Sequence, residues 1–119
     1  MNAKDYVSQL SQIMNFPLGI LKDTSNEKEG TRPLFVTLSR ANYGAVDSAI
    51  IEFQGSPPRC SVFISGLQYS PMCRSIMVHG KTLRPMSKKH SAAVKLVSDF
   101  LAVWCAEHNE TLSQVGTGI

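Results

Sequence analysis

The sequence predicts an α+β domain in which an N-terminal helix and a long C-terminal helix flank an antiparallel sheet of four to five strands. Two observations support this prediction. Apolar residues recur at helical spacing near both ends of the chain, and runs of β-branched and aromatic residues lie between them. The connections between these runs are short and show no helical pattern, which favours antiparallel pairing. The 119 residues are expected to form one domain with both helices on one face of the sheet.

The first helix is predicted over residues 4–14. Val7, Leu10 and Met14 recur at helical spacing, and polar residues occupy the opposite side. The helix is expected to end before Pro17, because a proline disfavours helical conformation in the residue that precedes it.

The strands are predicted from short runs rich in β-branched and aromatic residues. These runs lie at 34–38, 49–53, 60–64 and 75–78, with a short strand at 19–22 and a return strand at 81–84 as additional candidates. Glycine- and proline-containing segments at 55–59 and 79–80 supply the turns.

The last helix is predicted over 88–107. Ser87 is a suitable N-cap, and Pro85 prevents an earlier start. Apolar residues recur at three- and four-residue spacing on one face, namely Ala93, Val97, Phe100, Leu101, Trp104 and Cys105. Residues 110–119 are expected to form a frayed tail.

Composition indicates a folded intracellular protein, cytoplasmic or nuclear. The hydrophobic fraction is 43% and the charged fraction 18%, and the N-terminal residues lack the apolar segment of a secretory signal. No apolar run is long enough to cross a membrane. Cys60, Cys73 and Cys105 are odd in number and far apart, which indicates reduced thiols and not a disulfide framework.

Sequence motifs of enzymes are missing, so we expect a binding protein with no catalytic residues and no cofactor. A Cys/His nucleophile pair stays open, because such partners meet only in the folded chain. Cys105 and His108 have the spacing of two zinc ligands, but structural zinc sites usually combine two such pairs. We therefore predict no metal site, with a buried Cys105 and with His108 near the helix C-terminus, where a cation is favoured.

A basic stretch precedes and opens the last helix. The net charge is +3, and no acidic residue lies between Cys73 and Lys95, a segment that contains Arg74, Lys81, Arg84, Lys88, Lys89 and Lys95. Such a stretch is either a solvated face or a site for a polyanion. Lys88 and Lys89 fall in the first helical turn, where the helix dipole favours anions, so an external phosphate would compensate them. Two solvated lysines would also cost only tenths of a kcal/mol there and need no ligand.

The segment 79–93, which contains Ser-Lys-Lys-His-Ser-Ala-Ala from Ser87, resembles the second hairpin and final helix of the double-stranded RNA-binding domain. In that family the helix opens Ser-Lys-Lys-x-Ala-Lys. Residues 6–17 are similar to the family's first helix and its closing proline, and Phe35 follows at a similar distance. Ala92 replaces the third lysine, which removes one phosphate contact, and the Gly-Pro-x-His loop signature is missing from 24–32. The stretch from Phe35 to Ser87 is longer than the family needs, which implies an inserted hairpin within 41–75.

The resemblance implies an α-β-β-β-α core that binds double-stranded RNA by shape, through 2′-hydroxyls in two minor grooves and phosphates in the major groove between them. Lys88 and Lys89 would then contact phosphates, Gln9 and Gln12 would face one minor groove, and the loop 24–32 would enter the next. The full set of candidate nucleic-acid-binding residues is Lys88, Lys89, Ser87, Gln9, Gln12, Arg84, Lys95 and Arg32.

The alternative function is a protein-interaction or dimerisation module of the same fold, and a virus-encoded or defence-related factor is a third class that suits a compact binding domain. The alternative is suggested by the additional apolar residues Phe63, Leu67, Tyr69 and Met72, which would mark a partner surface if they were exposed. Phe63 and Tyr69 would equally suit the core.

Overall fold

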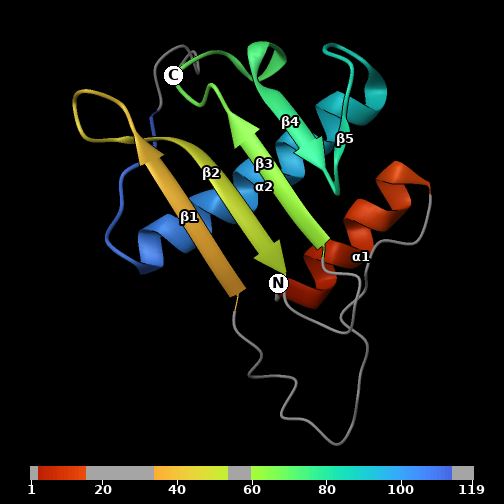
Figure 1. Cartoon of the computed structure of the whole chain (residues 1–119), viewed down its shortest axis with the longest axis horizontal. Coiled ribbons are helices and arrows are strands. Elements are labelled where there is room, and N and C mark those ends of the chain that lie inside the picture. Colours follow the sequence, from red (N-terminus) through yellow and green to blue (C-terminus); the bar gives the residue numbers. More distant parts are fainter. Residues whose placement is uncertain (1–2, 16–33, 54–59, 114–119) are drawn as a thin grey trace, which may run out of the picture.

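The computed structural model describes residues 3–15, 34–53 and 60–113 (Figure 1). Along the chain these residues form α1 (Ala3–Met14), β1 (Leu34–Arg40), β2 (Val46–Phe53), β3 (Cys60–Ser65), the 3₁₀ helix η2 (Pro71–Cys73), β4 (Ser75–Val78), β5 (Lys81–Thr82) and α2 (Lys88–Glu107). The predicted α+β class is confirmed. The candidate strand 19–22 and the turn 55–59 lie outside the described residues.

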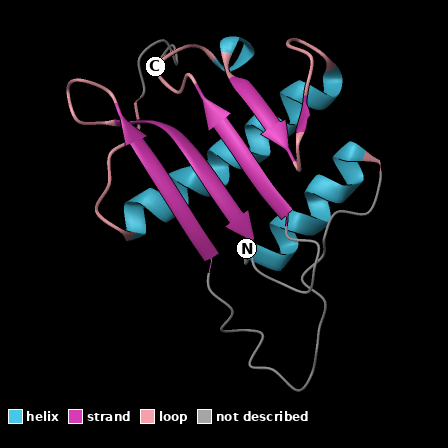
Figure 2. Ribbon diagram, viewed as in Figure 1, coloured by secondary structure: helices cyan, strands magenta, loops and turns pink. Residues whose placement is uncertain are grey.

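The five strands form one sheet in the order β1-β2-β3-β4-β5, and each strand is antiparallel to the next (Figure 2). Side chains alternate between the two faces, as expected for strands with one buried face. In β2, for example, Ala49, Ile51 and Phe53 are buried whereas Ile50 is exposed. The predicted antiparallel pairing is therefore confirmed.

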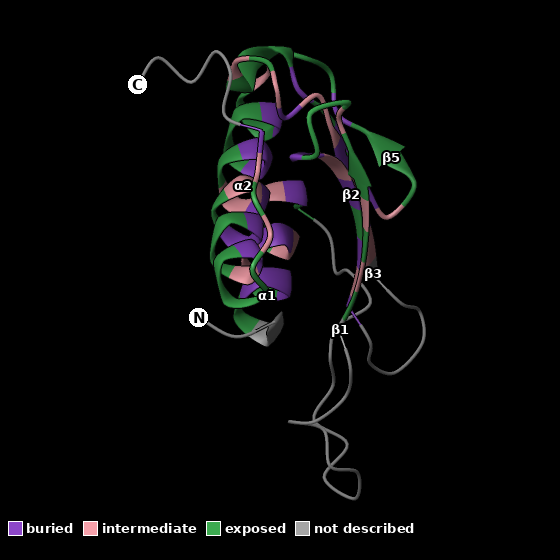
Figure 3. Cartoon of the chain, turned by 90° about the vertical axis from the view of Figure 1, so that its left-hand side faces the viewer, coloured by how far each residue is buried: buried purple, intermediate pink, exposed green. Residues whose placement is uncertain are grey.

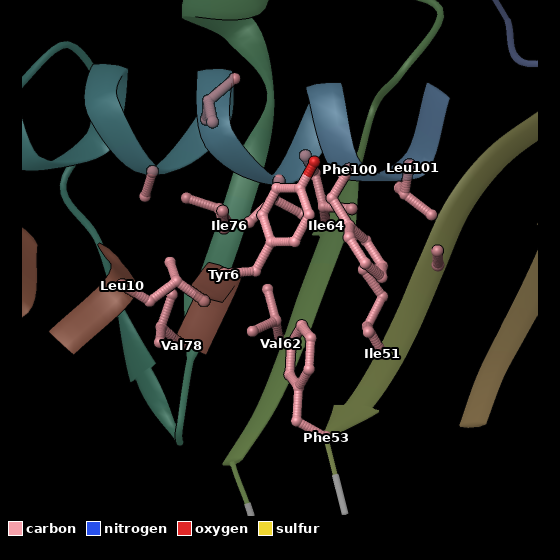
Figure 4. Close-up of a cluster of buried hydrophobic side chains, with 14 of the residues drawn as sticks. Tyr6, Leu10, Ile51, Phe53, Val62, Ile64, Ile76, Val78, Phe100 and Leu101 are labelled. Carbon is pink, nitrogen blue, oxygen red and sulfur yellow. The ribbon is translucent and has the colours of Figure 1, made fainter. Parts of the chain in front are cut away.

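Both helices pack on the same face of the sheet and contact one another, and their exposed residues face away from it (Figure 3). The core fills the space between the two layers. The Tyr6 ring of α1 meets the Phe100 ring of α2 edge-on with centroids 4.5 Å apart, and the Phe53 ring of β2 lies 5.6 Å from Phe100 (Figure 4). Contacts between aromatic rings in these geometries add to the stabilisation that burial provides. Three elements distant in sequence thus share one cluster.

The segment after α2 corrects one prediction. The prediction of a frayed tail over 110–119 is wrong for 110–113, because these residues pack against the connection between β1 and β2, and 114–119 lie outside the described residues. The Val46 N–H donates to the carbonyl of Thr111 over 2.6 Å, and the Ser113 N–H donates to the carbonyl of Val46 over 2.9 Å. The hydroxyl of Tyr43 also donates to Ser113 Oγ over 2.9 Å. Because these bonds join residues far apart in sequence, no local pattern predicts them.

Candidate nucleic-acid interface

The first turn of α2 brings four of the predicted site residues together. Ser87 has extended backbone angles, and its Oγ accepts a hydrogen bond from the His90 N–H over 3.0 Å, so the predicted N-cap is confirmed. The Ser87 N–H donates in turn to the carbonyl of Arg84 over 3.2 Å. Arg84, Lys88 and Lys89 are exposed, and the first turn contains no acidic residue. Three cations therefore surround a helix N-terminus whose amides favour anions.

His90 fixes the direction in which these lysines point. Its side chain is completely buried, and its Nε2 lies 2.6 Å from the carbonyl oxygen of Arg74. A helix turns by about 100° per residue, so Lys88 projects almost opposite to the buried His90. Lys89 projects sideways from the same turn. The buried imidazole thus directs Lys88 to solvent.

Arg74 does not belong to this basic surface, although the sequence groups it with the other cations. Only 6% of the residue is exposed. Its guanidinium donates to Ser98 Oγ at 2.9 Å and to the carbonyls of Leu67 and Tyr69 at 3.3 Å each. Burial lowers the pKa of this guanidinium. Arg74 therefore ties the segment that precedes η2 to α2 from inside the domain.

Lys95 lies two turns into α2 and is exposed, but it forms an ion pair with an acidic residue. Its Nζ lies 3.0 Å from Oδ2 of Asp99, one turn further along the helix. The two side chains border an open groove of about 620 Å³ between η2 and α2, lined by Ser70, Pro71, Met72, Arg74, Ser91, Val94, Lys95, Ser98 and Asp99. The carboxylate of Asp99 therefore partly neutralises Lys95, whereas the first turn that contains Lys88 and Lys89 has no acidic residue.

The other predicted binding residues do not belong to the first turn of α2. Gln12 is exposed on α1, whereas Gln9 is partly buried there. Since α1 and α2 form one layer, Gln12 and Lys88 both belong to the helical side of the domain (Figure 3). Arg32 and the loop 24–32 lie outside the described residues.

The apolar residues considered for a partner surface divide into three environments. Leu67 is buried in the core, and Phe63 is half-buried on the open face of the sheet. Met72 is 56% exposed and lines the groove between η2 and α2. Tyr69 is 54% exposed and directly precedes the groove residue Ser70. Sequence reasoning missed the exposed apolar residues Phe35, Ile50 and Met77 on the open sheet face. The sequence could have identified them, because side chains along a strand point alternately to the two faces of the sheet and these residues alternate with the buried ones.

Among the residues that the structure describes, no group of three His, Cys, Asp or Glu residues is placed to hold a metal ion. Cys105 is buried, as predicted, and burial raises the pKa of its thiol. His108 is exposed and stacks on Trp104, with ring centroids 3.9 Å apart. Within the described residues, no helix is long and apolar enough to span a membrane.

No protein-family model, curated protein or solved structure matches the chain.

Proposed function

We propose that this protein binds double-stranded RNA through its helical layer, with the first turn of α2 as the phosphate-binding element. One observation carries the proposal: Lys88 and Lys89 are exposed at a capped helix N-terminus with no acidic residue in the first turn. Arg84 adds a third exposed cation immediately before the cap. Phosphates on a nucleic-acid backbone are the ligands that such an arrangement favours.

The preference for RNA over DNA rests on the position of α1 beside α2. Gln12 offers an amide that can both donate to and accept from a 2′-hydroxyl, the group that distinguishes RNA from DNA. The order of helix, antiparallel sheet and helix supports the resemblance to the double-stranded RNA-binding domain. In this proposal the inserted segment lies within 41–75, and the turn at 79–80 between β4 and β5 belongs to the hairpin that precedes the binding helix.

The test is binding of a labelled RNA duplex of about 20 base pairs, long enough for a domain of this kind to span its site of about 16. Duplex DNA and single-stranded RNA of the same length serve as controls. If Arg84, Lys88 and Lys89 each neutralise one phosphate, the logarithm of the binding constant should fall with the logarithm of salt with a slope of about −3. Equal affinity for all three nucleic acids would contradict the proposal.

Substitution then locates the site. The double variant Lys88→Ala, Lys89→Ala should lose most of the affinity at moderate salt and reduce the salt slope by about two. The variant Arg40→Ala is the control, because it also removes a cation but lies beside Glu110, away from the first turn of α2. Unchanged affinity in the double variant would rule out the first turn of α2 as the phosphate site.

The alternative function, protein interaction, is favoured by the exposed apolar side chains on the opposite face of the sheet. The two functions use opposite faces of the domain and are therefore compatible.

A further inference from the structure

The outward face of the sheet carries a continuous row of side chains across all five strands. The register pairs Thr37 with Ile50, Ile50 with Phe63, Phe63 with Met77 and Met77 with Thr82. Ile50 is 42% exposed and Met77 is 37% exposed, and Phe35 on the neighbouring row is 51% exposed. Both helices lie on the other face, so among the described residues no helix covers this row (Figure 3).

The charge of this face limits what it can bind. The outward positions of the described strands are Phe35, Thr37, Ser39, Ser48, Ile50, Glu52, Ser61, Phe63, Ser65, Ser75, Met77 and Thr82. Glu52 is the single charged residue among them, and none is basic. The other acid of β2, Asp47, lies where the register between β1 and β2 shifts, and its carboxylate accepts a hydrogen bond from the Gln68 N–H over 3.2 Å. A nucleic acid would find no cation on this face, and a strongly charged protein surface would lose hydration without gaining an opposite charge. The matching partner is a nearly neutral face with an apolar centre.

We propose that the occupant of this face is a second copy of the chain, which forms a symmetric dimer through the row from Thr37 to Thr82. The centre of the row is apolar, because Ile50, Phe63 and Met77 lie between the two threonines. A two-fold axis that runs along the row places each of these residues against its own counterpart, so apolar side chains meet apolar side chains.

The flanking rows also fit this symmetry. Glu52 lies on one side of the row, next to Phe35 and Ser61, and Ser48 lies on the other side. The same two-fold axis brings Glu52 over Ser48 of the second copy, so each carboxylate faces a hydroxyl donor and not the other carboxylate. The single charge of the face therefore does not oppose association.

The area of the face limits the size of the dimer interface. The five strands contain 7, 8, 6, 4 and 2 residues, and with strands about 4.8 Å apart and a rise of about 3.3 Å per residue they give a footprint of about 430 Å² per copy. The sum of about 850 Å² is below the roughly 1,200–2,000 Å² that stable specific interfaces bury. We therefore expect a weak, concentration-dependent dimer and not an obligate one.

Dimerisation through the sheets leaves both helical layers facing outward. If the helical layer binds double-stranded RNA as proposed above, one dimer would present two binding sites on opposite sides and could link two duplexes. This consequence rests on the proposed function, whereas the dimer itself does not.

Sedimentation equilibrium of the full chain between about 1 μM and about 1 mM tests the dimer. The wild-type chain should change from monomer to dimer across this range. The double variant Ile50→Lys, Met77→Lys should stay monomeric, because it places two cations at the centre of the symmetric contact. Val103→Lys is the matched control, since Val103 is 55% exposed but lies on α2, and it should dimerise like the wild type. A wild-type chain that stays monomeric throughout, or a dimer that persists in the double variant, would overturn the proposal.

A second measurement needs no substitution of the face. Methyl NMR signals of Ile50 and Met77 should shift with protein concentration, whereas those of Val103 should not. Absence of shifts at Ile50 and Met77 would overturn the proposal even if the lysine variant failed to fold. The variant Lys88→Ala, Lys89→Ala should dimerise like the wild type. The variant Ile50→Lys, Met77→Lys should bind the RNA duplex with the affinity of the wild-type monomer. Failure of the dimer proposal is therefore distinguishable from failure of the RNA-binding proposal.

Discussion

His90 Nε2 and the carbonyl oxygen of Arg74 form a buried hydrogen bond of 2.6 Å that joins the first turn of α2 to the end of η2. A carbonyl oxygen can only accept, so Nε2 carries the proton in this bond. Its Nδ1 is buried and has no hydrogen-bond partner among the described residues. The bond connects the candidate RNA-binding turn to the interior of the domain.

Replacement of His90 should destabilise the fold. His90→Ala leaves a cavity and removes the donor to the Arg74 carbonyl, and we expect it to lower the free energy of unfolding by about 2–4 kcal/mol. His90→Gln retains an N–H donor and should cost less. Urea denaturation of both variants measures the difference, and an alanine variant as stable as the wild type would show that the bond contributes nothing.

The same substitution should lower the free energy of unfolding at Arg74 and leave it nearly unchanged at Arg84. Arg74→Met leaves the Leu67 and Tyr69 carbonyls without their donor, which should lower the free energy of unfolding by about 1–3 kcal/mol for each unpaired group. Arg84→Met is the matched control at an exposed position and should change stability by less than about 0.5 kcal/mol.

The two variants should also differ in RNA binding. Arg84→Met should weaken binding of the RNA duplex, whereas Arg74→Met should preserve it at temperatures where the variant is folded. Thermal denaturation and duplex binding, measured on both proteins, check the pair. Equal destabilisation by the two substitutions would contradict the assignment of Arg74 to the interior.

Arg74 and Arg84 also show where sequence reasoning succeeds and where it fails. The Ser87 cap and the bounds of α2 follow from local rules, and the structure reproduces them. Strand alternation likewise predicts which residues of β2 are buried. Both arginines belong to one acid-free stretch, however, and only contacts with Leu67 and Ser98 decide that Arg74 is internal. Such contacts depend on how the helices and strands pack together, and local sequence patterns do not predict this packing.

Lys95 should contribute less to RNA binding than Lys88. Asp99 already neutralises Lys95 across one helical turn, whereas no acidic residue lies in the first turn of α2. Lys95→Ala should therefore weaken duplex binding only slightly, and Lys88→Ala should weaken it several-fold. Asp99→Asn releases Lys95 from its carboxylate and should strengthen binding. These affinities are compared at one fixed salt concentration, because the binding constant depends strongly on salt. A loss of affinity in Asp99→Asn would contradict this role for the pair.

The contact between Arg40 and Glu110 should make stability depend on pH. Arg40 donates to both carboxylate oxygens of Glu110, at 2.5 and 3.0 Å, and these hydrogen bonds hold the pKa of the carboxyl below its ordinary value. In the unfolded chain Glu110 should titrate at its ordinary pKa of about 4.3. A carboxyl with a lower pKa in the folded state stabilises the fold above the unfolded pKa, and this stabilisation disappears as the pH falls through the folded pKa.

Glu110→Gln removes this titration, so the variant should be less stable than the wild type at neutral pH and should approach it in acid below the ordinary glutamate pKa. Glu107→Gln is the control, because it removes the same charge from an exposed position at the end of α2. Urea denaturation at neutral and acidic pH measures the two differences. Amide exchange at Ser113 should also accelerate in Glu110→Gln, since its N–H bonds to Val46 within the segment that the ion pair holds. A stability difference that does not change with pH would show that the Glu110 carboxylate does not hold the segment 110–113 against the connection between β1 and β2.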